Sequence, residues 1–482
     1  MYIGVDLGTS SLKLLVSDNE GKVLFDVRES YDVLKPKLGY SEISPLVFKD
    51  AFLSALKKVD QRIPLKELNA ISFSGQMHGL VCLDKDDRPV RNVILWNDNR
   101  AIKECKMLNG KEKKSIQETG NIAFPGFTLP KLLWMRKHEP ALYKKIDKIM
   151  LPKDYLVYLM TGKFVSDVSD LSGTLFYDVK NHCYAKKALE IAEIDEEKLP
   201  RILGSVDVAG TPSQEFLSLL SVNPEAKVVV GGGDQAMGAL GTGTIKEKTM
   251  HIQLGTSGVV YVCQESYKEN KNQAIHHFAD ASGKYLLMGV TLNAAGALAW
   301  WTDDVLESSS VAKELEGIDA LDTGDLLFLP YLNGERSPIN DPFAKGVFYG
   351  INIAHDRKYM NKAVIEGVGL ALYDSYKEIL KTVGEVHKIR IIGGGSKSPA
   401  WCQIMADIFN HEISLINTND GGSLGAIVLA MVADHKFASI EEAADHLIWD
   451  TETYVPNPKM HAYYERKYRA FKKLYRTLKE MR

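Results

Sequence analysis

Short apolar runs that end in glycine-rich turns alternate with stretches of helical period along this chain. Runs with the length and composition of strands cover residues 2–5, 12–16, 22–26, 69–74, 81–83, 227–230 and 388–392. Helical patterns follow two of these runs, at residues 235–240 and 399–409. Units of strand, glycine turn and helix predict an α/β fold in which helices cover the sheets.

Two turns far apart in the chain have nearly the same sequence, and each lies between two apolar runs. They read Asp6-Leu7-Gly8-Thr9-Ser10 and Gln253-Leu254-Gly255-Thr256-Ser257. Both predict a β-hairpin whose tip offers backbone N–H groups and hydroxyls to phosphate oxygens. Asp6 is a carboxylate where the second copy has the neutral Gln253, so it suits Mg²⁺ held through water. The repeat therefore predicts an ATP site built between duplicated domains.

At 482 residues the chain is long enough for two domains of about 200–250 residues each. We place the boundary just before the second hairpin, which gives domains of residues 1–245 and 246–482. The expected fold is α/β, with two ribonuclease-H-like domains of the kind shared by sugar kinases, actin and Hsp70 ATPases, and ATP in the cleft between them.

Composition excludes several other classes of protein. The net charge of −3 argues against a general nucleic-acid or membrane-surface binder, and no apolar run approaches the ~20 residues needed to span a bilayer. The five cysteines are scattered and never spaced as Cys-x-x-Cys, which is typical of reduced thiols in a cytosol. A strand begins at residue 2, so no signal peptide is expected. These features favour a cytoplasmic protein.

The last twenty residues, 463–482, hold eight basic and two acidic side chains. Apolar side chains recur there at spacings of four and three, which predicts one apolar helical face. They are Tyr464, Tyr468, Phe471, Tyr475 and Leu478. A docked helix with a solvated basic face is favoured over the alternative, a contact with nucleic acid.

Asp234 opens the predicted helix that follows Gly231-Gly232-Gly233. The segment matches the dinucleotide pattern G-x-G-x-x-A, but it comes late in the chain and lacks the acidic strand end that should follow. We expect the glycines to let the backbone approach a ligand and Asp234 to accept the proton of an attacking sugar hydroxyl. Gln235 then donates to a second hydroxyl. The alternative for Asp234 is a helix N-cap.

Three further segments carry candidate binding groups at strand ends. Residues 74–79 and 96–100 are rich in polar side chains, with Trp96 among them, and suit a polyhydroxy ligand unless they are ordinary loops. His78 has no His or Cys partner at metal-binding spacing. Residues 393–398 lack the P-loop pattern, because Ser396 stands where a glycine should precede Lys397. A glycine floor for a flat adenine is the preferred interpretation.

Taken in order, these segments resemble the FGGY carbohydrate kinases over essentially the whole chain. Gly126, Thr128, Lys131 and Trp134 look like the first signature of that family, and residues 346–351 with 363–367 look like the second. Tyr359 departs from the second signature, in which a polar residue is usual. Within the family, residues 74–79, 95–98, 151–155, 231–234 and 334–338 are most similar to the branch that phosphorylates D-xylulose.

The resemblance implies ATP-dependent phosphorylation of D-xylulose to D-xylulose 5-phosphate, with Mg²⁺ as the metal. It implies that the sugar is surrounded by Met77, His78, Asp234 and Gln235, with Trp96 as one wall. It implies that the nucleotide is bound by Asp6, Gly8, Thr9, Ser10, Gly255, Thr256, Gly296, Gly394, Gly395 and Ser396. A homodimer is also expected from the resemblance. Gln235 stands where Asn is common in this branch, which bears on the choice of ketose.

Three alternatives to this function stay open at this point. One is a kinase of the same family for ribulose, gluconate or a deoxyketose. The second is a sugar-independent ATPase of the actin–Hsp70 type, which leaves the polar segment around Met77 and His78 unexplained. The third is a non-catalytic sugar sensor, against which the presence of both Asp6 and Asp234 argues.

Overall fold

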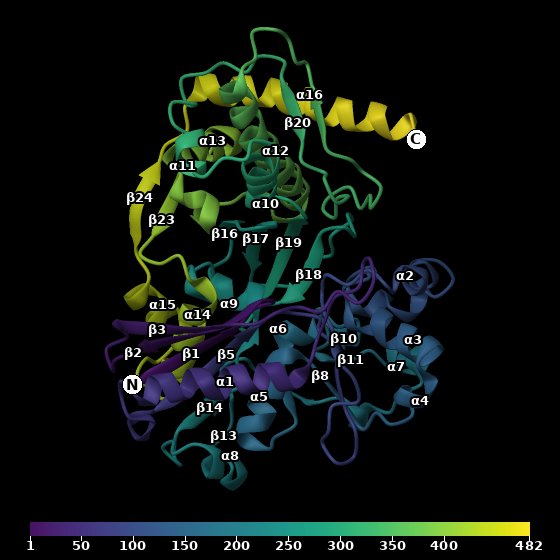
Figure 1. Cartoon of the computed structure of the whole chain (residues 1–482), viewed down its shortest axis with the longest axis vertical. Helices are drawn as coiled ribbons and strands as arrows, with labels where there is room; N and C mark the ends of the chain where they lie inside the picture. Colours follow the sequence, from purple (N-terminus) through teal and green to yellow (C-terminus); the bar gives the residue numbers. More distant parts are fainter. The chain divides into compact units, whose positions relative to one another are not determined.

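A computed structural model describes all 482 residues of the chain. Its contacts define two compact units (Figure 1), each described here by itself. Unit 1 comprises Met1–Ile245, His277–Tyr285 and Asp420–Ile448, and unit 2 comprises Lys246–His276, Leu286–Asn419 and Trp449–Arg482. Two later segments of the chain therefore belong to unit 1, while the simpler domain division at residue 245 stays a prediction.

The sheet of unit 1 is mixed. Its strands follow the order β13-β14-β5-β1-β2-β3, and the short β15 also pairs with β5. β1 pairs antiparallel with β2 and parallel with β5, which in turn is parallel to β14. The bounds are β1 Tyr2–Leu7, β2 Ser11–Ser17, β3 Val23–Ser30, β5 Ala70–Gly75, β13 Val208–Gly210, β14 Lys227–Val229 and β15 Gly232–Gly233.

The main sheet of unit 2 repeats this arrangement. The strands of this sheet that lie mainly in unit 2 follow the order β19-β17-β16-β22-β23-β24, with β16 antiparallel to β17 and parallel to β22. The bounds are β16 Thr249–Leu254, β17 Gly258–Gln264, β19 Tyr285–Thr291, β22 Lys388–Ile392, β23 Ile413–Ile416 and β24 Asp450–Tyr454. In each unit the first strand of the hairpin pairs antiparallel with the second and parallel with a strand from later in the chain, which is followed by a further parallel strand (β2-β1-β5-β14 and β17-β16-β22-β23); this confirms the predicted duplication.

Helices cover both faces of the sheet of unit 1. In Figure 1, α1 (Pro45–Asp60) runs below the strands β1 to β3, and α14 (Gly421–Ala433) lies above them. α14 packs against β1, β5 and α9. The other helices of this unit are α2 Ile102–Asn109, α3 Thr128–His138, α4 Pro140–Tyr143, α5 Pro152–Thr161, α6 Val168–Leu171, α7 Lys186–Ala192, α8 Gln214–Leu219, α9 Asp234–Gly241 and α15 Ile440–Leu447.

The short strands of unit 1 connect these helices. They are β4 Glu42–Ile43, β6 Val81–Leu83, β7 Val93–Ile94, β8 Lys148–Met150, β9 Val165–Asp167, β10 Tyr177–Asp178, β11 Cys183–Tyr184 and β12 Arg201–Leu203. Phe48, Phe52 and Phe73 are fully buried between α1 and the sheet, so the apolar side of α1 forms the core of this unit.

Unit 2 packs its helices around the 27-residue α12. They are α10 Ala295–Ala299, α11 Val311–Glu314, α12 Arg357–Val383, α13 Pro399–Phe409 and α16 Pro458–Glu480, with a π-helical turn at Trp300–Val305 and the hairpin β20 Leu327–Leu329 and β21 Val347–Tyr349. α13 and β22 have the bounds expected from the sequence.

The C-terminal helix α16 docks onto unit 2, as its spacing predicts. Tyr464, Tyr468, Phe471 and Tyr475 are buried. One of its basic residues is buried as well, because Lys467 Nζ lies 2.6 Å from Glu366 Oε2. The basic face is therefore not entirely solvated.

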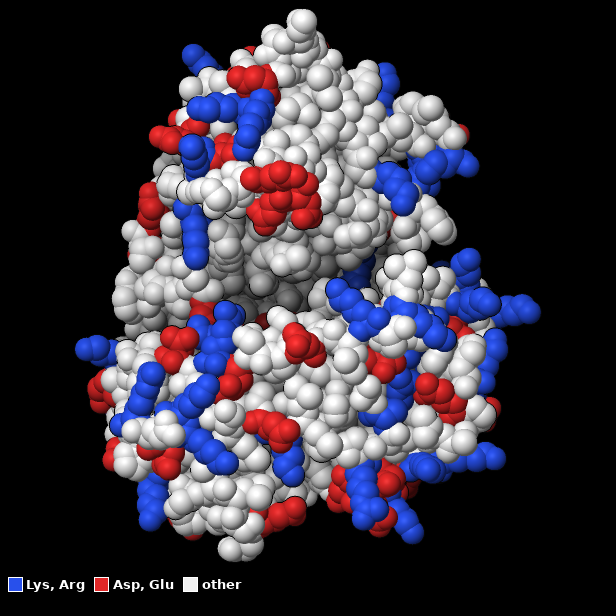
Figure 2. Space-filling model, viewed as in Figure 1, with Lys and Arg blue, Asp and Glu red and all other residues white.

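Charged side chains of both signs are mixed on the surface. Figure 2 shows Lys and Arg side chains interspersed with Asp and Glu on the face it presents. None of the helices has the length and apolar character that a membrane crossing requires. All five cysteines are free thiols.

Candidate active site

Asp234 is the first residue of α9, and the N-cap is Gly233. The N-cap alternative is therefore wrong: the Asp234 side chain projects from the first turn and does not cap the helix. Burial and the charge of Asp6 raise the pKa of Asp234 to about 7, although Gln235 donates to the carboxylate from its side chain and backbone. The amide oxygen of Gln235 has no partner. A half-buried carboxyl with this pKa suits a general base near neutral pH.

Asp6 lies in β1 beside this carboxylate. Its Oδ1 accepts a hydrogen bond of 2.8 Å from Ser74 Oγ at the end of β5. Burial and the charge of Asp420 raise the pKa of Asp6 to about 6, while Ser74 and Lys13 act in the opposite direction. Lys13 Nζ lies 2.6 Å from Asp420 Oδ2. Unit 1 thus gathers the carboxylates of Asp6, Asp234 and Asp420 and the ammonium group of Lys13 near the ends of its central strands.

Asp420 is a residue of this site that the sequence analysis missed. It is the N-cap of α14 and accepts from Ser423 N. An acidic residue before Gly421 and Gly422 is a local helix-start signal, but nothing local connects it to Asp6. In the folded protein the first turn of α14 lies against Asp6, because a Cβ on Gly422 would be 3.0 Å from Asp6 Cγ.

The three glycines before Asp234 are in close contact with other parts of unit 1. A Cβ on Gly231, whose φ is +75°, would lie 1.8 Å from the Phe73 carbonyl oxygen. A Cβ on Gly232 would lie 2.7 Å from Ser169 Oγ, and one on Gly233 would lie 2.8 Å from Met77 Cγ. The space beside these glycines is filled by the chain itself. They let the backbone before Asp234 pack closely against Phe73, Ser169 and Met77, while the expected approach to a ligand stays a prediction.

The first hairpin is hydrogen-bonded to the polar segments at the neighbouring strand ends. Trp96 Nε1 donates to Thr9 Oγ1 at 2.9 Å, and Gln76 Nε2 donates to the Gly8 carbonyl at 3.1 Å. Tyr31 OH donates to the same carbonyl at 2.6 Å. Ser10 is exposed at the tip. The candidate phosphate hairpin and one candidate wall of the sugar site therefore form one connected structure.

Met77 and His78 are both buried in the turn after β5. His78 has a φ of +71°, a conformation that residues other than glycine rarely adopt. Its Nδ1 lies 2.8 Å from the Gly173 carbonyl, and its ring packs 4.5 Å from the Phe127 ring. Asp6, Gly8, Thr9, Met77, His78, Trp96, Asp234 and Gln235 thus all lie in unit 1, which the structure brings together from separate stretches of sequence.

The remaining predicted residues lie in unit 2. Gly255, Thr256, Gly296 and Gly394 line one cavity of about 610 Å³, together with Asp303 and Asp304. The turn at Gly255–Thr256 is fixed by hydrogen bonds from Ala295 N to the Gly255 carbonyl (2.7 Å) and from Gly296 N to the Thr256 carbonyl (3.1 Å). This cavity has the turn chemistry expected of the second phosphate hairpin.

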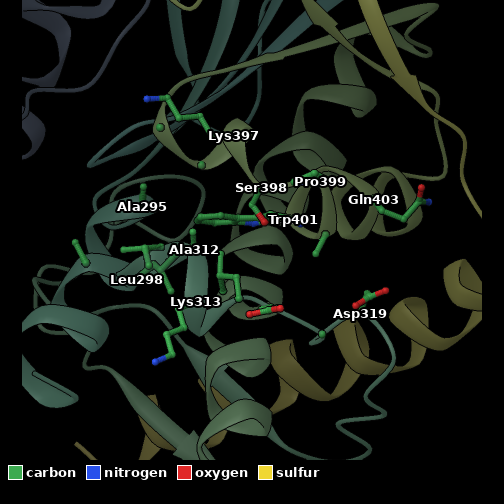
Figure 3. A pocket seen from close by; sticks show the side chains of 18 of the residues that line it. Ala295, Leu298, Ala312, Lys313, Asp319, Lys397, Ser398, Pro399, Trp401 and Gln403 are labelled. Atoms are coloured by element: carbon green, nitrogen blue, oxygen red, sulfur yellow. Dashed lines mark hydrogen bonds between the residues drawn. The ribbon is translucent and has the colours of Figure 1, made fainter. Parts of the chain in front are cut away.

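A larger cavity of about 1140 Å³ adjoins it and shares Ala295, Ala299 and Gly394 with it. Its lining is mostly apolar, and in Figure 3 the Trp401 ring lies between Leu298 and Ser398. A Cβ on Gly394 would meet nothing within 4 Å, so this glycine borders open space. The size, the apolar lining and the glycine suit a flat nucleobase.

Two parts of the predicted glycine floor are constrained by packing inside unit 2, although Gly395 also lines the larger cavity. A Cβ on Gly395 would lie 2.8 Å from Leu254 Cβ and from the Trp401 ring, so Gly395 is needed for packing. Ser396 is buried and its hydroxyl donates to the Gly393 carbonyl at 2.8 Å, inside its own turn. Ser396 lines neither cavity.

Family models match both halves of the chain. The N-terminal domain of the FGGY family of carbohydrate kinases matches residues 1–241, and its C-terminal domain matches residues 250–433. The chain belongs to the FGGY family of carbohydrate kinases. It is therefore a sugar kinase, and the alternative of a sugar-independent actin–Hsp70 ATPase is wrong.

Individual relatives agree with the family. The xylulose kinase of Escherichia coli (strain K12) is 35% identical over 482 residues, covering 99% of both chains. Among solved structures, a xyloylose kinase from Brucella ovis is 32% identical with a TM-score of 0.94, covering 100% of both chains. A gluconate kinase from Lactobacillus acidophilus is 28% identical with the same TM-score of 0.94, covering 99% of this chain and 98% of the other. These matches establish the two-domain sugar-kinase fold.

Proposed function

We propose that this kinase transfers the γ-phosphoryl group of Mg-ATP to the terminal hydroxyl of D-xylulose, with Asp234 as the general base. The observation that carries the proposal is the carboxyl of Asp234, whose pKa is raised to about 7 beside Met77 and the other polar strand ends of unit 1. The xylulose kinase relatives support the choice of sugar, because several are 33–38% identical over nearly the whole chain.

In this reaction the oxygen of the sugar hydroxyl forms a bond to the γ-phosphorus, and the bond from that phosphorus to the β–γ bridging oxygen breaks. The hydroxyl proton passes to Asp234, and ADP leaves with the bridging oxygen. Phosphoryl transfer depends mainly on positioning and charge neutralisation. Asp234 orients the hydroxyl from the first turn of α9, Gln235 offers its free amide oxygen to a second hydroxyl, and Trp96 forms a wall fixed to Thr9.

In unit 2, we propose that the adenine occupies the larger cavity beside Gly394 and that the phosphates lie near the turn at Gly255–Thr256. The apolar lining around Trp401 and Leu298 supports the first part. The exposed hydroxyl of Thr256 and its turn supply donors for phosphate oxygens. Ser396 contributes by shaping this turn, since its hydroxyl is bonded inside it, whereas Gly395 both packs against Leu254 and lines the larger cavity.

The residues of unit 1 also fit the Mg²⁺ that such a kinase requires. Asp6 and Asp420 lie close enough for the charge of one to raise the pKa of the other, and a divalent cation relieves that repulsion. No group of three or more His, Cys, Asp or Glu side chains is arranged to hold a metal directly. Asp6 would therefore hold the ion through water, and the ion would neutralise charge on the phosphates.

The test is ADP release with Mg-ATP across D-xylulose, D- and L-ribulose, gluconate, glycerol, D-xylose and no sugar. We expect a strong rate with D-xylulose alone. Gluconate is the second candidate, because the gluconate kinase structure superimposes with the same TM-score as the xyloylose kinase. A faster rate with gluconate or ribulose would overturn the choice of sugar and direct attention to Gln235. No turnover with any of these sugars would overturn the proposed reaction. The expected homodimer is tested separately, by light scattering.

A further inference from the structure

The first turn of α3 holds the backbone of His78. Lys131 is fully buried, and its Nζ donates to the His78 carbonyl at 2.6 Å. Thr128, one turn earlier on the same helix, donates to the same carbonyl through its hydroxyl at 3.0 Å. Two side chains of one helix therefore converge on one backbone oxygen of the candidate sugar site.

That oxygen belongs to a strained residue. The φ of +71° at His78 is unfavourable for a residue other than glycine, and such strain persists only where the surroundings fix it. The imidazole is fixed by the Gly173 carbonyl and the Phe127 ring. The carbonyl is fixed by Lys131 and Thr128. The direction of the His78 side chain thus depends on contacts made by its backbone.

The same ammonium group also reaches the second wall of the site. Lys131 Nζ donates to the Ile94 carbonyl at 3.0 Å and to the Leu95 carbonyl at 3.3 Å, directly before Trp96. The backbone of Trp96 is approached closely from the segment before α3, since a Cβ on Gly126 would lie 2.0 Å from the Trp96 carbonyl oxygen. The signature residues Gly126, Thr128 and Lys131 therefore all contact the backbones of the two walls.

We propose that Lys131 is a positioning residue for the sugar site: one buried ammonium group joins the His78 turn to the strand end that carries Trp96, and so sets the distance between two walls of the site. The proposal rests on the proposed placement of the sugar between these walls. Lys131 itself is fully buried, so it acts through the backbone it holds and does not contact the sugar.

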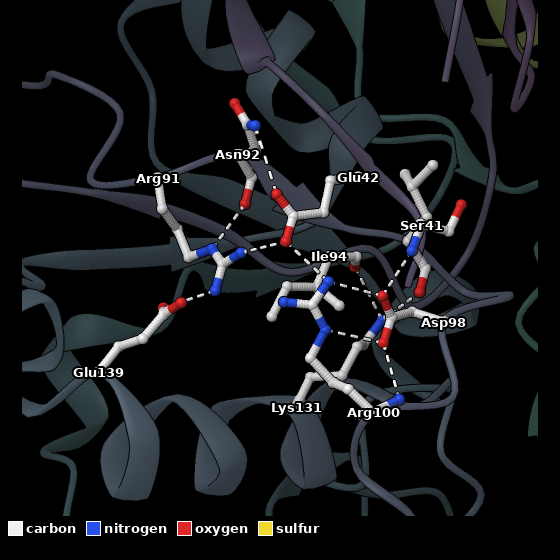
Figure 4. A network of polar contacts seen from close by, with 10 residues as sticks. Ser41, Glu42, Arg91, Asn92, Ile94, Asp98, Arg100, Lys131 and Glu139 are labelled. Atoms are coloured by element: carbon white, nitrogen blue, oxygen red, sulfur yellow. Dashed lines mark hydrogen bonds and ion pairs between the residues drawn. The ribbon is translucent and has the colours of Figure 1, made fainter. Parts of the chain in front are cut away.

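The Lys131 ammonium group is hydrogen-bonded to carbonyl oxygens and is not paired directly with a carboxylate. Asp98 is fully buried and accepts from Ser41 N (2.7 Å) and from Arg100 Nη2 (2.7 Å), so its carboxylate is already paired. Figure 4 shows the Arg91 and Arg100 guanidinium groups on either side of the Glu42 carboxylate, and Arg100 lies 3.9 Å from the centre of the Tyr40 ring. Lys131 is left with three carbonyl oxygens as its acceptors.

This arrangement makes the site sensitive to pH. An ammonium group has three donors for the three carbonyls, whereas a neutral amine has two and so loses one of these hydrogen bonds. Burial lowers the pKa of Lys131 to about 7, with Asp98 raising it and Arg100 lowering it. The protonated, fully paired form is therefore lost as pH rises through this value, and sugar affinity should weaken in the same range.

The experiment is calorimetric titration of D-xylulose and, separately, of ADP into the full-length protein. Lys131→Met keeps the length of the side chain and removes its donors, and Lys137→Met is the matched control because Lys137 is exposed on the same helix. We expect Lys131→Met to raise the Kd for D-xylulose at least tenfold while the Kd for ADP stays unchanged. Lys137→Met should change neither. Unchanged sugar affinity in Lys131→Met overturns the proposal.

The pH dependence gives a readout that a merely structural role would not change. In an Asp234→Asn background, which removes the titration of the base, the Kd for D-xylulose should rise between pH 6.5 and 9. In the Asp234→Asn, Lys131→Met double variant it should be weak and flat. A rise that persists in the double variant contradicts the role of Lys131. Where Lys131→Met fails to fold, Thr128→Val decides, with a few-fold rise expected and no rise counting against the proposal.

A different result would refute the proposed sugar site itself. Sugar binding that is insensitive to Met77→Ala would place the sugar elsewhere and refute the proposed site. Sensitivity to Met77→Ala without sensitivity to Lys131→Met leaves the site standing and refutes only the positioning role. If the wild type binds gluconate and not D-xylulose, the same titrations are made with gluconate and decide the role of Lys131 on that ligand.

Discussion

Asp234→Asn should remove turnover and at the same time stabilise the protein. General-base catalysis contributes about 10²–10⁴-fold, so kcat should fall by at least two orders of magnitude. The stability effect follows from the pKa of Asp234, which rises from 3.8 to about 7 in the folded protein. That rise of about 3 units corresponds to about 4 kcal/mol by which the ionised carboxylate destabilises the fold.

The sign and the pH window follow from linkage. A carboxyl with a raised folded pKa contributes stability that is present below pH 3.8 and is lost as pH rises through about 7. In the wild type, Asp234 therefore lowers the free energy of unfolding by the full amount at pH 8 and by roughly 2 kcal/mol at pH 5. The amide of the variant cannot ionise, so the advantage of Asp234→Asn should be largest at pH 8, with about 4 kcal/mol as the upper limit.

The assay is urea denaturation of wild type and Asp234→Asn at pH 5 and pH 8, alongside ADP titration and a turnover assay. We expect a higher midpoint for the variant, a larger difference at pH 8, unchanged ADP binding and no measurable turnover. Asp86→Asn serves as the control, because Asp86 is an exposed carboxylate in a turn of the same unit. Near-normal kcat would refute the base assignment, and a variant less stable at pH 8 would refute the electrostatic reasoning.

Three further outcomes are expected. Gly394→Val should raise the KM for ATP more than tenfold without loss of stability, since its Cβ enters open space, as nucleotide titration and thermal denaturation will show. Trp96→Phe loses the hydrogen bond to Thr9, worth about 1 kcal/mol, and should raise the sugar KM about fivefold in steady-state kinetics. Lys467→Met leaves Glu366 buried without its cation and should lower stability by about 3–5 kcal/mol in urea denaturation; a shift below 1 kcal/mol would mean the pair contributes little.

Local patterns were sufficient for much of the fold. The bounds of β22 and α13 follow from an apolar run and from a proline start with helical period, and both hairpins follow from their Gly-Thr-Ser turns. The assignment of α14 to unit 1 was not predictable in this way. Its sequence specifies an apolar helix, but which sheet it covers depends on packing between residues more than 400 positions apart.

The candidate site was predictable to the extent that side chains carry its chemistry. Asp6, Asp234 and the second hairpin could be proposed from the sequence because carboxylates and Gly-Thr turns have recognisable functions. Asp420 was missed because its role depends on its closeness to Asp6. Lys131 was recognised only as part of a motif, since its partners are backbone carbonyls, which leave no signal in the sequence. The close packing of the glycines before Asp234 was missed for the same reason, because their neighbours come from distant parts of the chain.

The candidate sites of the two units differ in how much they destabilise the folded protein. Unit 1 holds two carboxylates of raised pKa near one another, a histidine with positive φ and a buried lysine of lowered pKa. Each of these is unfavourable by itself and persists because neighbouring contacts fix it. The cavity beside Gly394 in unit 2 is open, apolar space that needs no such strain. Neutralising substitutions in the sugar site should therefore lower activity while raising stability, whereas substitutions that fill the nucleotide cavity should reduce affinity alone.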